Sequence, residues 1–441
     1  MSKKSKLEIV LVIFTLCLYI FIRSLHFSEF LNFSFDQAWS STRILEIWKN
    51  KEITLVGPGS SIVVNGKQIL QGSINYYFNL IFLLLGNFDP IISSYLFMLF
   101  AGLMIIPLYL GVRYLFNKNV AFFIVIIYSL LPLYIDFTRF FFGPSFQLSL
   151  LPLIVLFMGL YKKSKKLSYF FLFFFFTGIE SQFHFAFLLI FIILFFYYLI
   201  TYTTSHSHES GNLYNRFLLP ILAFLIGFSP IIIFELKNNF YNIRLFAKYL
   251  QHQPSFSNFQ LLPHRYLSIS LIILILLTPA YKKYLSRSLL VLLTVLLIII
   301  DLVLYLPKPK QAFGMAKNWN YLLEKKAYEI IKKENLKDFN IANLIYDNLS
   351  VVIKYQMKKD NYLINFDDYY HNKYLFVIDK SKSNISKNPA YEIQTFSPRR
   401  KLKQWKINNF YNLYLFERID DRAKREKCHI EQTNYKSNKR Q

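Results

Sequence analysis

Long apolar runs separated by short polar breaks dominate most of the chain. Between residue 7 and residue 306 each strong run approaches the roughly 20 apolar residues that a helix needs to cross a hydrocarbon core about 30 Å thick. From Lys308 onward, charged and polar residues interrupt every apolar run. The pattern predicts a membrane region followed by a water-exposed domain. The strong candidate spans lie at 7–25, 91–112, 119–136, 144–161, 217–234, 266–280 and 288–306.

Two further apolar segments do not fit the length of a single span. Residues 167–200 are too long for one ordinary span, and the polar break from Glu180 to His184 divides them into two short helices. Residues 73–87 are short, and a crossing there would break the charge pattern of the loops. We therefore predict that 73–87 forms a helix in the outer interface of the membrane.

Basic residues determine the orientation of the spans. With nine crossings, the N-terminal lysines between residues 3 and 6 and the basic loops 113–118, 162–166 and 282–287 all face the cytoplasm. The sequence thus predicts an all-α polytopic membrane protein with about nine spans and an interfacial helix. Residues 1–306 form this region, the N-terminus is cytoplasmic, and residues 26–90 form a long first outer loop.

The C-terminal part reads as a small extracytoplasmic α/β domain at 307–419. Residues 317–335 predict an amphipathic helix, whereas three short segments predict strands. Long domains cross membranes largely regardless of charge, so the many lysines do not oppose this location. Residues 420–441 predict a basic disordered tail. The strands are expected at 340–346, 362–366 and 373–378.

Composition and charge narrow the class of partner. The chain is 54% hydrophobic and 19% aromatic, which fits lipid as the main solvent. Its net charge of +25 comes from residues at span ends and across the terminal domain, so we expect anionic lipid or glycolipid as partner and no nucleic acid. The two cysteines, Cys17 and Cys428, indicate neither a disulfide framework nor a thiolate metal site.

The predicted topology places most of the unusual polar residues at the outer side of the membrane. Ionisable groups at membrane depth are costly, and therefore they indicate function as a set, although each one alone has an equally good structural explanation. The set consists of Asp36, Gln37, Asp136, Arg139, Glu180, Gln182, His184, Glu235, Lys237 and Arg244.

Three of these residue types suit particular chemistry. Apolar neighbours around Asp36 would raise its basicity and suit it to accept a proton, whereas the structural alternative is an N-cap for a helix over 37–50. Arg139 and His184 are candidate phosphate ligands. Their structural alternatives are an interface anchor and a hydrogen bond between packed helices. Asp301, which could pair with a nearby Lys or Arg, ranks below them.

Several short motifs follow one another along the membrane region. They are Asp36 in the first loop, the stretch Gly57 to Ser61, Gly72 with Tyr76 and Tyr77, Arg139 ahead of Pro144 and Ser145, Gln182 with His184, and Pro230 with Phe234 to Lys237. In the order of these motifs, the chain resembles the GT-C superfamily of membrane glycosyltransferases. The resemblance is specifically to bacterial relatives of dolichyl-phosphate-mannose protein mannosyltransferases, and it covers roughly residues 7–306.

The resemblance implies inverting transfer of a sugar from a polyprenyl-phosphate donor to an acceptor hydroxyl on a protein, a lipid or a cell-envelope glycan. It implies that Asp36 is the general base and that Arg139, His184, Lys237 and Arg244 bind the donor phosphate. Many relatives carry Asp-Glu where this chain has Asp36 and Gln37, which weakens the case for a carboxylate-bound metal. No cofactor is expected, and the need for a divalent metal stays open. The supporting residues are Gln37, Tyr76, Tyr77, Asp136, Glu180, Gln182 and Glu235.

Two other functional classes remain open. A flippase or transporter of lipid-linked sugars would carry internal repeats and charged residues near the membrane midplane. A non-catalytic membrane scaffold would tolerate the loss of Asp36.

Overall fold

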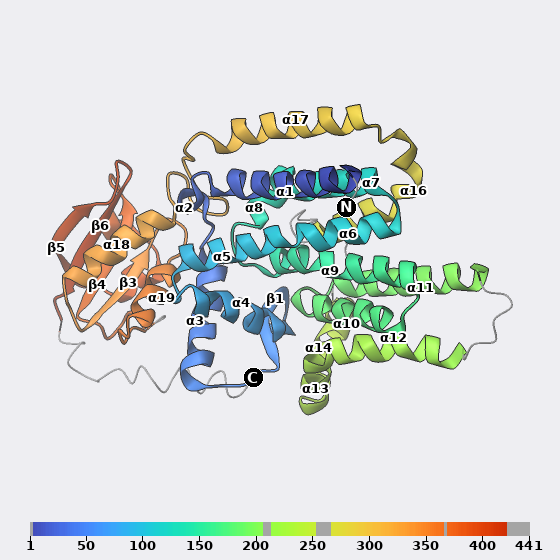
Figure 1. Cartoon of the computed structure of the whole chain (residues 1–441). Helices are drawn as coiled ribbons and strands as arrows, with labels where there is room; N and C mark the ends of the chain where they lie inside the picture. The colour runs from blue at the N-terminus through green and yellow to red at the C-terminus, as the bar shows by residue number, and fades with distance from the viewer. Residues whose placement is uncertain (1–2, 206–212, 253–265, 366–367, 421–441) are drawn as a thin grey trace. The chain divides into compact units, whose positions relative to one another are not determined.

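The computed structural model describes residues 3–205, 213–252, 266–365 and 368–420, and these form two compact units (Figure 1). The helical unit comprises Met1–Leu25 and Asn50–Pro307, and the α/β unit comprises His26–Lys49 and Lys308–Gln441. The disordered tail expected from the sequence lies, beyond Asp420, outside the described residues.

The helical unit consists of apolar helices joined by short turns, with one antiparallel β-hairpin. Its helices are α1 (Lys3–Ser24), α4 (Ile74–Leu85), α5 (Pro90–Leu103), α6 (Ile105–Leu115), α7 (Lys118–Leu130), α8 (Pro132–Phe137), α9 (Gly143–Ser164), α10 (Leu167–Phe183), α11 (Phe187–Ser205), α12 (Leu213–Gly227), α13 (Ser229–Lys237), α14 (Tyr241–His252), α15 (Leu267–Leu276), α16 (Thr278–Tyr281) and α17 (Arg287–Tyr305). The hairpin strands are β1 (Val56–Val64) and β2 (Lys67–Gly72).

A helix occupies each of the nine predicted span positions. Within the described residues, α1, the continuous pair α5–α6, α9 and α17 are long and apolar enough to cross a membrane. Two further positions hold sharply bent pairs, α12–α13 with a bend of 73° and α15 with the turns that follow it, with a bend of 52°. The remaining positions hold shorter apolar helices, so nine crossings stay a prediction. The predicted interfacial segment is α4, whose 12 residues are too short for a hydrocarbon core of about 30 Å.

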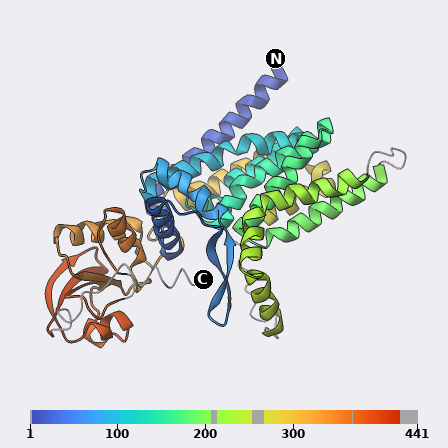
Figure 2. The same cartoon turned by 90° about the horizontal axis from the view of Figure 1, so that it is seen from below.

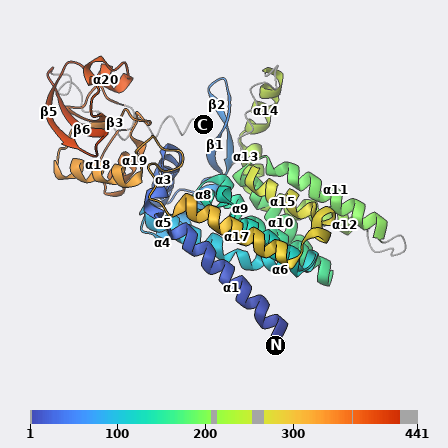
Figure 3. The same ribbon diagram turned by 90° about the horizontal axis from the view of Figure 1, so that it is seen from above.

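The C-terminal ends of α1 and α17 meet at Arg139. One guanidinium nitrogen of Arg139 donates to the Ile22 carbonyl oxygen at 3.0 Å, and the guanidinium carbon lies 4.5 Å from the Tyr305 ring centroid. The two helices therefore run in the same direction, as Figure 3 also shows. If both cross the membrane, the number of crossings from the first to the last must be odd, and the predicted nine satisfies this condition.

The basic loops and the helix ends that they join lie at one end of the helical unit, opposite the end that contains Arg139. Glu8 at the start of α1 forms an ion pair with Arg113 near the end of α6 at 3.0 Å. The Lys162 ammonium donates to the last carbonyl oxygen of α6 at 2.5 Å, and the Asn119 side chain donates to the 282–287 loop at 3.4 Å. All three basic loops thus share one end with the N-terminus, in agreement with the positive-inside pattern.

This arrangement predicts the accessibility of the two ends. In a Cys17→Ser, Cys428→Ser background, single cysteines at the exposed positions Ser164 and Lys237 should react with an impermeant thiol reagent from opposite sides of sealed vesicles. The reason is that Ser164 ends α9 at the basic end, whereas Lys237 is the last residue of the bent α12–α13 pair. Labelling of both positions from one side would overturn the alternation of crossings.

The α/β unit is built around a mixed four-stranded sheet with the strand order β3-β4-β6-β5. Strands β3 and β4 are parallel, and the other two pairs are antiparallel. The strands are β3 (Phe339–Asn343), β4 (Tyr374–Lys380), β5 (Arg399–Lys406) and β6 (Tyr411–Arg418). The helices are α2 (Phe27–Phe30), α3 (Phe35–Asn50), α18 (Tyr321–Lys333), α19 (Val351–Lys359) and α20 (Tyr391–Thr395).

The structure confirms the small α/β fold and corrects one of its predicted strands. The helix expected at 317–335 is α18, and the strands expected at 340–346 and 373–378 are β3 and β4. The strand expected at 362–366 is wrong in its described residues. Asn361 has a φ of 64°, and the Tyr362 N–H donates to the Met357 carbonyl oxygen at 2.9 Å. This left-handed turn closes α19, so the backbone of Tyr362 is used at the helix end.

Candidate functional site

Asp36 lies in the first turn of α3, where it is not the helix cap. The cap is Ser34, whose N–H and hydroxyl donate to the Gln37 side-chain oxygen at 3.3 and 2.9 Å. Gln37 therefore supports the helix start in the manner of a capping box, and the expectation of Asp36 as N-cap is wrong. Among the described residues no hydrogen bond or ion pair engages the Asp36 carboxylate. Desolvation raises its pKa, although the side chain keeps contact with solvent.

Aromatic packing fixes the segment that carries Asp36 within the α/β unit. The buried Phe33 ring lies 5.5 Å from the Tyr321 ring and 5.4 Å from the Tyr355 ring, measured between centroids. Further along α3, Lys358 forms an ion pair with Glu46 at 2.9 Å. Residues far apart in the sequence thus hold α3 from both ends, and Asp36 belongs to the same unit as the C-terminal sheet.

Arg139 is a buried residue of the helical unit, with only 1% of its surface exposed. Besides its hydrogen bond to Ile22, it packs on Tyr305, whose hydroxyl donates to Asp136 Oδ1 at 3.0 Å. The structure therefore brings the predicted residues Arg139 and Asp136 together through Tyr305. Because its side chain is enclosed by protein, the alternative of a simple interface anchor is wrong.

Sequence reasoning missed Arg23, the second buried arginine of this cluster. Its Nε donates to Thr138 Oγ1 and one terminal nitrogen donates to the Ser129 carbonyl oxygen, both at 2.6 Å. Its guanidinium carbon lies 3.5 Å from the Tyr19 ring centroid. The available signal was an arginine placed inside the end of the first apolar run, where an unpaired charge would be costly.

Asp301 completes the charge balance of this cluster. It is fully buried, neither carboxylate oxygen has a hydrogen-bond partner among the described residues, and it interacts electrostatically with Arg23 and Arg139. Among the described residues no ion pair joins Asp301 to either arginine, so the expected pairing with a basic residue stays a prediction. With Asp136 included, two arginines and two aspartates compensate one another, so a phosphate approaching Arg139 would also meet two carboxylates.

A second cluster forms where the β-hairpin meets the end of α10. A Cβ added to Gly72 would lie 2.4 Å from Gln182 Cβ, so only glycine lets the end of β2 pack directly on this side chain. Gln182 Nε2 donates to the Gly227 carbonyl oxygen at the end of α12 at 2.7 Å. Close approach of the Gly178 and Gly227 backbones brings the two helices together here.

His184 and Glu180 lie at the same helix end and are linked to the start of α9. Gln147 Nε2 donates to the Glu180 carbonyl oxygen at 2.9 Å and to the His184 carbonyl oxygen at 3.3 Å. His184 Nδ1 accepts from the Ala186 N–H at 3.3 Å. Sequence reasoning did not single out Gln147, although a polar residue early in an apolar run was a signal for it. The Glu180 side chain is fully buried, and neither of its carboxylate oxygens has a partner among the described residues.

The turn before α9 connects the arginine cluster to the hairpin cluster. Gly143 follows Arg139 by one short turn, and a Cβ there would lie 3.0 Å from the Phe183 carbonyl oxygen and 3.3 Å from Asn75 Nδ2. Nearby, the Tyr77 hydroxyl accepts from the Thr54 N–H at 2.8 Å and donates to the Thr54 carbonyl oxygen at 3.1 Å. Tyr77 therefore fixes α4 to the segment that enters β1, and the adjacent Tyr76 is buried.

The segment formed by α13 and the start of α14 contains three predicted residues. Glu235 has a structural role, whereas the two basic residues are exposed. The Glu235 carboxylate accepts from the Asn242 and Ile243 N–H groups at 3.2 and 3.4 Å, so it caps α14. Lys237 and Arg244 are exposed, and Arg244 donates to a carbonyl oxygen of the preceding turn at 3.2 Å. Their position on α13 and α14 separates them from the buried Arg139.

The β-hairpin also joins the start of α14 to the cluster around Gln182. The Asn242 side chain accepts from the Leu70 N–H at 2.8 Å and donates to the Leu70 carbonyl oxygen at 3.1 Å. Figure 2 shows the hairpin and α13–α14 leaving the same end of the helical unit. The segments around Gly72, Gln182 and Asn242 therefore meet at one end of this unit, and this region is the candidate site.

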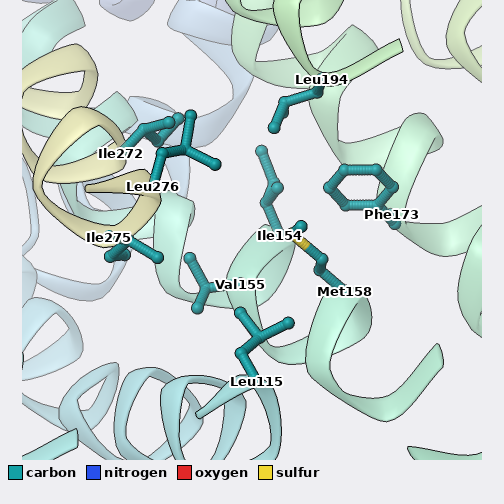
Figure 4. Close-up of a pocket in the computed structure, with 9 residues that line it drawn as sticks. All are labelled: Leu115, Ile154, Val155, Met158, Phe173, Leu194, Ile272, Ile275 and Leu276. Atoms are coloured by element: carbon teal, nitrogen blue, oxygen red, sulfur yellow. The ribbon is translucent and has the colours of Figure 1, made fainter. Parts of the chain in front are cut away.

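The pocket shown in Figure 4 has a different character. It lies between α6, α9, α10, α11 and α15, and every side chain that lines it is apolar. Leu115 places it toward the basic end of the unit, and nothing in its lining could position a phosphate or a hydroxyl group. In the part of the chain that the structure describes, no three His, Cys, Asp or Glu residues gather as metal ligands.

Glu180 provides a test of function against stability. A buried carboxylate without a partner is costly, so Glu180→Gln should keep or raise the melting temperature. If Glu180 supplies one charged interaction of about 1.5–3 kcal/mol to a substrate, the same change should lower activity roughly tenfold or more. Asp301→Asn is the matched control, because it leaves Asp136 as the one carboxylate facing two buried guanidinium groups and should lower the melting temperature. Full activity in Glu180→Gln would make Glu180 a structural residue.

Comparisons with known proteins give a likeness in structure and none in sequence. No protein-family model matches the sequence, and no curated protein matches it. The structure is similar to the crystal structure of ArnT from Cupriavidus metallidurans in the apo state, with 10% sequence identity and a TM-score of 0.49 over 96% of this chain and 99% of that chain. A likeness at this level carries no argument about function. The function proposed below is therefore argued from the residues of this chain.

Proposed function

We propose that this chain is a membrane glycosyltransferase that transfers a sugar from a polyprenyl-phosphate donor to an acceptor hydroxyl at the outer face of the membrane. The observation that carries the proposal is the meeting of three separated segments whose motifs resemble the GT-C superfamily. The end of β2 packs on Gln182, and β2 also pairs with Asn242 at the start of α14. A site built from distant segments is what a substrate pocket requires.

The proposed reaction is a single displacement with inversion at the anomeric carbon. Asp36 removes the proton from the acceptor hydroxyl, whose oxygen forms a bond to the anomeric carbon while the bond from that carbon to the phosphate oxygen breaks. The polyprenyl phosphate leaves with the electron pair of that bond. The absence of hydrogen bonds to the Asp36 carboxylate among described residues and the raised pKa both favour its action as a base.

Arg139 and His184 are the proposed groups that stabilise the leaving phosphate as its charge develops. Arg139 is already positioned by its bond to Ile22, and His184 follows the helix end that Gln147 fixes. Prior positioning of donors reduces the reorganisation needed in the transition state. The resemblance to protein mannosyltransferases extends the proposal to mannose-like donors and to protein or cell-envelope acceptors.

The flippase or transporter alternative fits the placement of charge less well. Arg23, Arg139 and Asp301 gather near the C-terminal ends of α1 and α17, whereas coupling sites of transporters lie near the midplane. A scaffold has no observation in its favour.

A donor panel tests the proposal. Full-length protein in nanodiscs is incubated with short-chain polyprenyl phosphates carrying different sugars, together with hydroxyl acceptors, and release of polyprenyl phosphate and transfer of sugar are measured. At least one donor should be consumed in the presence of an acceptor, with inverted configuration in the product. Movement of a donor across sealed vesicles without consumption would replace the transferase by a flippase.

A further inference from the structure

Helix α14 is fixed to the hairpin by one face. The buried residues Asn242 and Leu245 and the partly buried Tyr249 are spaced by three and four positions, so they lie on the same side of the helix. Asn242 pairs with the backbone of Leu70, and Leu245 joins an apolar cluster with Val64 and Ile69 from the hairpin. The rotation of α14 about its axis is therefore set by this contact.

The neighbouring face of α14 is apolar and exposed. Ile243, Phe246 and Leu250 also follow a spacing of three and four, and they expose 58%, 48% and 63% of their surfaces. Just before α14, Leu236 and Phe240 are exposed by 63% and 49%. Large apolar side chains that line up on one exposed face indicate a contact with an apolar phase or a partner. We call Ile243, Phe246 and Leu250 the apolar strip.

A basic strip borders the apolar strip. Arg244 and Lys248 are four positions apart and exposed, and the exposed Lys237 precedes the helix. At about 100° per residue, the order around the axis is hairpin face, apolar strip and basic strip. An exposed apolar strip beside a basic one is typical of a helix that lies in the plane of an anionic bilayer surface.

The position of α14 in the chain brings it to such a surface. It begins four residues after α13, which with α12 forms one of the bent pairs that pass as a membrane span. Figures 2 and 3 show α14 running beside the hairpin and across the direction of the long helices. A helix with this direction at the end of a span lies along the bilayer rather than through it.

We propose that α14 lies in the outer surface of the bilayer, with the apolar strip inserted between lipids and the basic strip on anionic lipid headgroups. This proposal does not depend on the reaction that the protein performs. It assigns Lys237 and Arg244 to lipid headgroups, in place of the donor-phosphate role that the family resemblance implies for them. The hairpin, which α14 holds through Asn242, is thereby kept at the membrane surface.

Spin labels measure the depth of the two exposed faces. Full-length Cys17→Ser, Cys428→Ser protein carries a label at Phe246→Cys or, as a matched control on the other exposed face, at Gln251→Cys, in nanodiscs that contain phosphatidylglycerol. Position 246 should be accessible to oxygen and shielded from a water-soluble nickel complex, and position 251 should show the reverse. Equal water accessibility at both positions would overturn the proposal. Spin–spin broadening at 246 would also overturn it, because a second copy would then cover the strip.

A second measurement tests whether the basic strip binds anionic groups, and whether these groups are lipid headgroups or the donor phosphate. Replacing phosphatidylglycerol by a zwitterionic lipid should raise the nickel accessibility of position 246 severalfold. The Arg244→Gln, Lys248→Gln variant should show the same accessibility in both lipids. If the nickel accessibility of position 246 did not depend on lipid charge, the proposed contact with anionic headgroups would be wrong. Recovery of shielding in zwitterionic nanodiscs by stoichiometric short-chain polyprenyl phosphate would assign the strip to the donor and overturn the lipid assignment.

Discussion

Asp36→Asn should remove sugar transfer while leaving the fold intact. The amide keeps the shape of the carboxylate but cannot accept the proton, and general-base catalysis typically contributes about 10²- to 10⁴-fold. No described residue donates a hydrogen bond to the carboxylate, so the substitution breaks no contact within α3. The lost interaction with the helix dipole costs about 0.3–1 kcal/mol at most. The measurement is the rate of polyprenyl phosphate release with saturating acceptor, together with the melting temperature.

Glu46→Gln is the matched control for this prediction. It makes the same change from carboxylate to amide on the same helix, and it removes two partly exposed ion pairs, with Arg43 at 3.5 Å and with Lys358 at 2.9 Å. Such pairs contribute about 0–1 kcal/mol, so this variant should stay active. Activity of Asp36→Asn within a few-fold of the unmodified protein would contradict the assignment of Asp36 as the base. Equal loss in both variants would point to the charge of α3 as a whole.

Substitution of Arg139 should weaken donor binding and also slow transfer from the bound donor, because Arg139 is proposed to stabilise the leaving phosphate. A hydrogen bond to a charged group contributes about 1.5–3 kcal/mol, so Arg139→Lys, which keeps the charge but loses the forked geometry, should raise the Kd for a short-chain polyprenyl phosphate roughly tenfold. Lysine is preferred to alanine here because Arg139 also holds Ile22 and faces Asp136 and Asp301. Asp36→Asn should bind the same donor as the unmodified protein does.

Arg23→Lys separates a ligand role of Arg139 from a packing role. Arg23 is as deeply buried in the same cluster, but its hydrogen bonds end on Thr138 and Ser129 within the helices. Arg23→Lys should therefore lower the melting temperature and leave the Kd of the folded protein unchanged. A similar rise in Kd for both variants would mean that the cluster acts through packing, and Arg139 would be removed from the proposed phosphate site.

The helices of the membrane region could be located from the sequence, whereas the contacts that join them could not. A span requires about 20 apolar residues, and such a run can be recognised locally in the sequence. No local pattern records that Glu235 caps a helix beginning beyond the next turn, or that Arg23 and Asp301 share one buried cluster. Nor does any local pattern record that Gly72 at the end of β2 packs on Gln182.

In the α/β unit, local sequence patterns also fail to identify the strand at the edge of the sheet. Strand β5 exposes nearly all of its side chains and carries a run of basic residues, so it lacks the alternation by which a half-buried strand is recognised. Its partner β6 is buried on both faces, and it was not predicted either, because Asn412 and the terminal Glu417 and Arg418 interrupt its apolar and aromatic residues. The strand predicted at 362–366 failed for the opposite reason, because apolar residues there follow a helix end. Burial without sheet pairing produced the same local signal as a strand.

The common direction of α1 and α17 has a consequence for biosynthesis. The α/β unit is assembled from two pieces of chain, one leaving α1 and the other leaving α17, and Phe33 from the first piece packs on Tyr321 and Tyr355 from the second. The first piece emerges early in translation and must wait for its partner until the last helix has been inserted. An insertion error that reversed α17 would strand the two pieces on opposite sides of the membrane. Completion of this unit therefore requires that α1 and α17 end on the same side of the membrane, whichever helices cross between them.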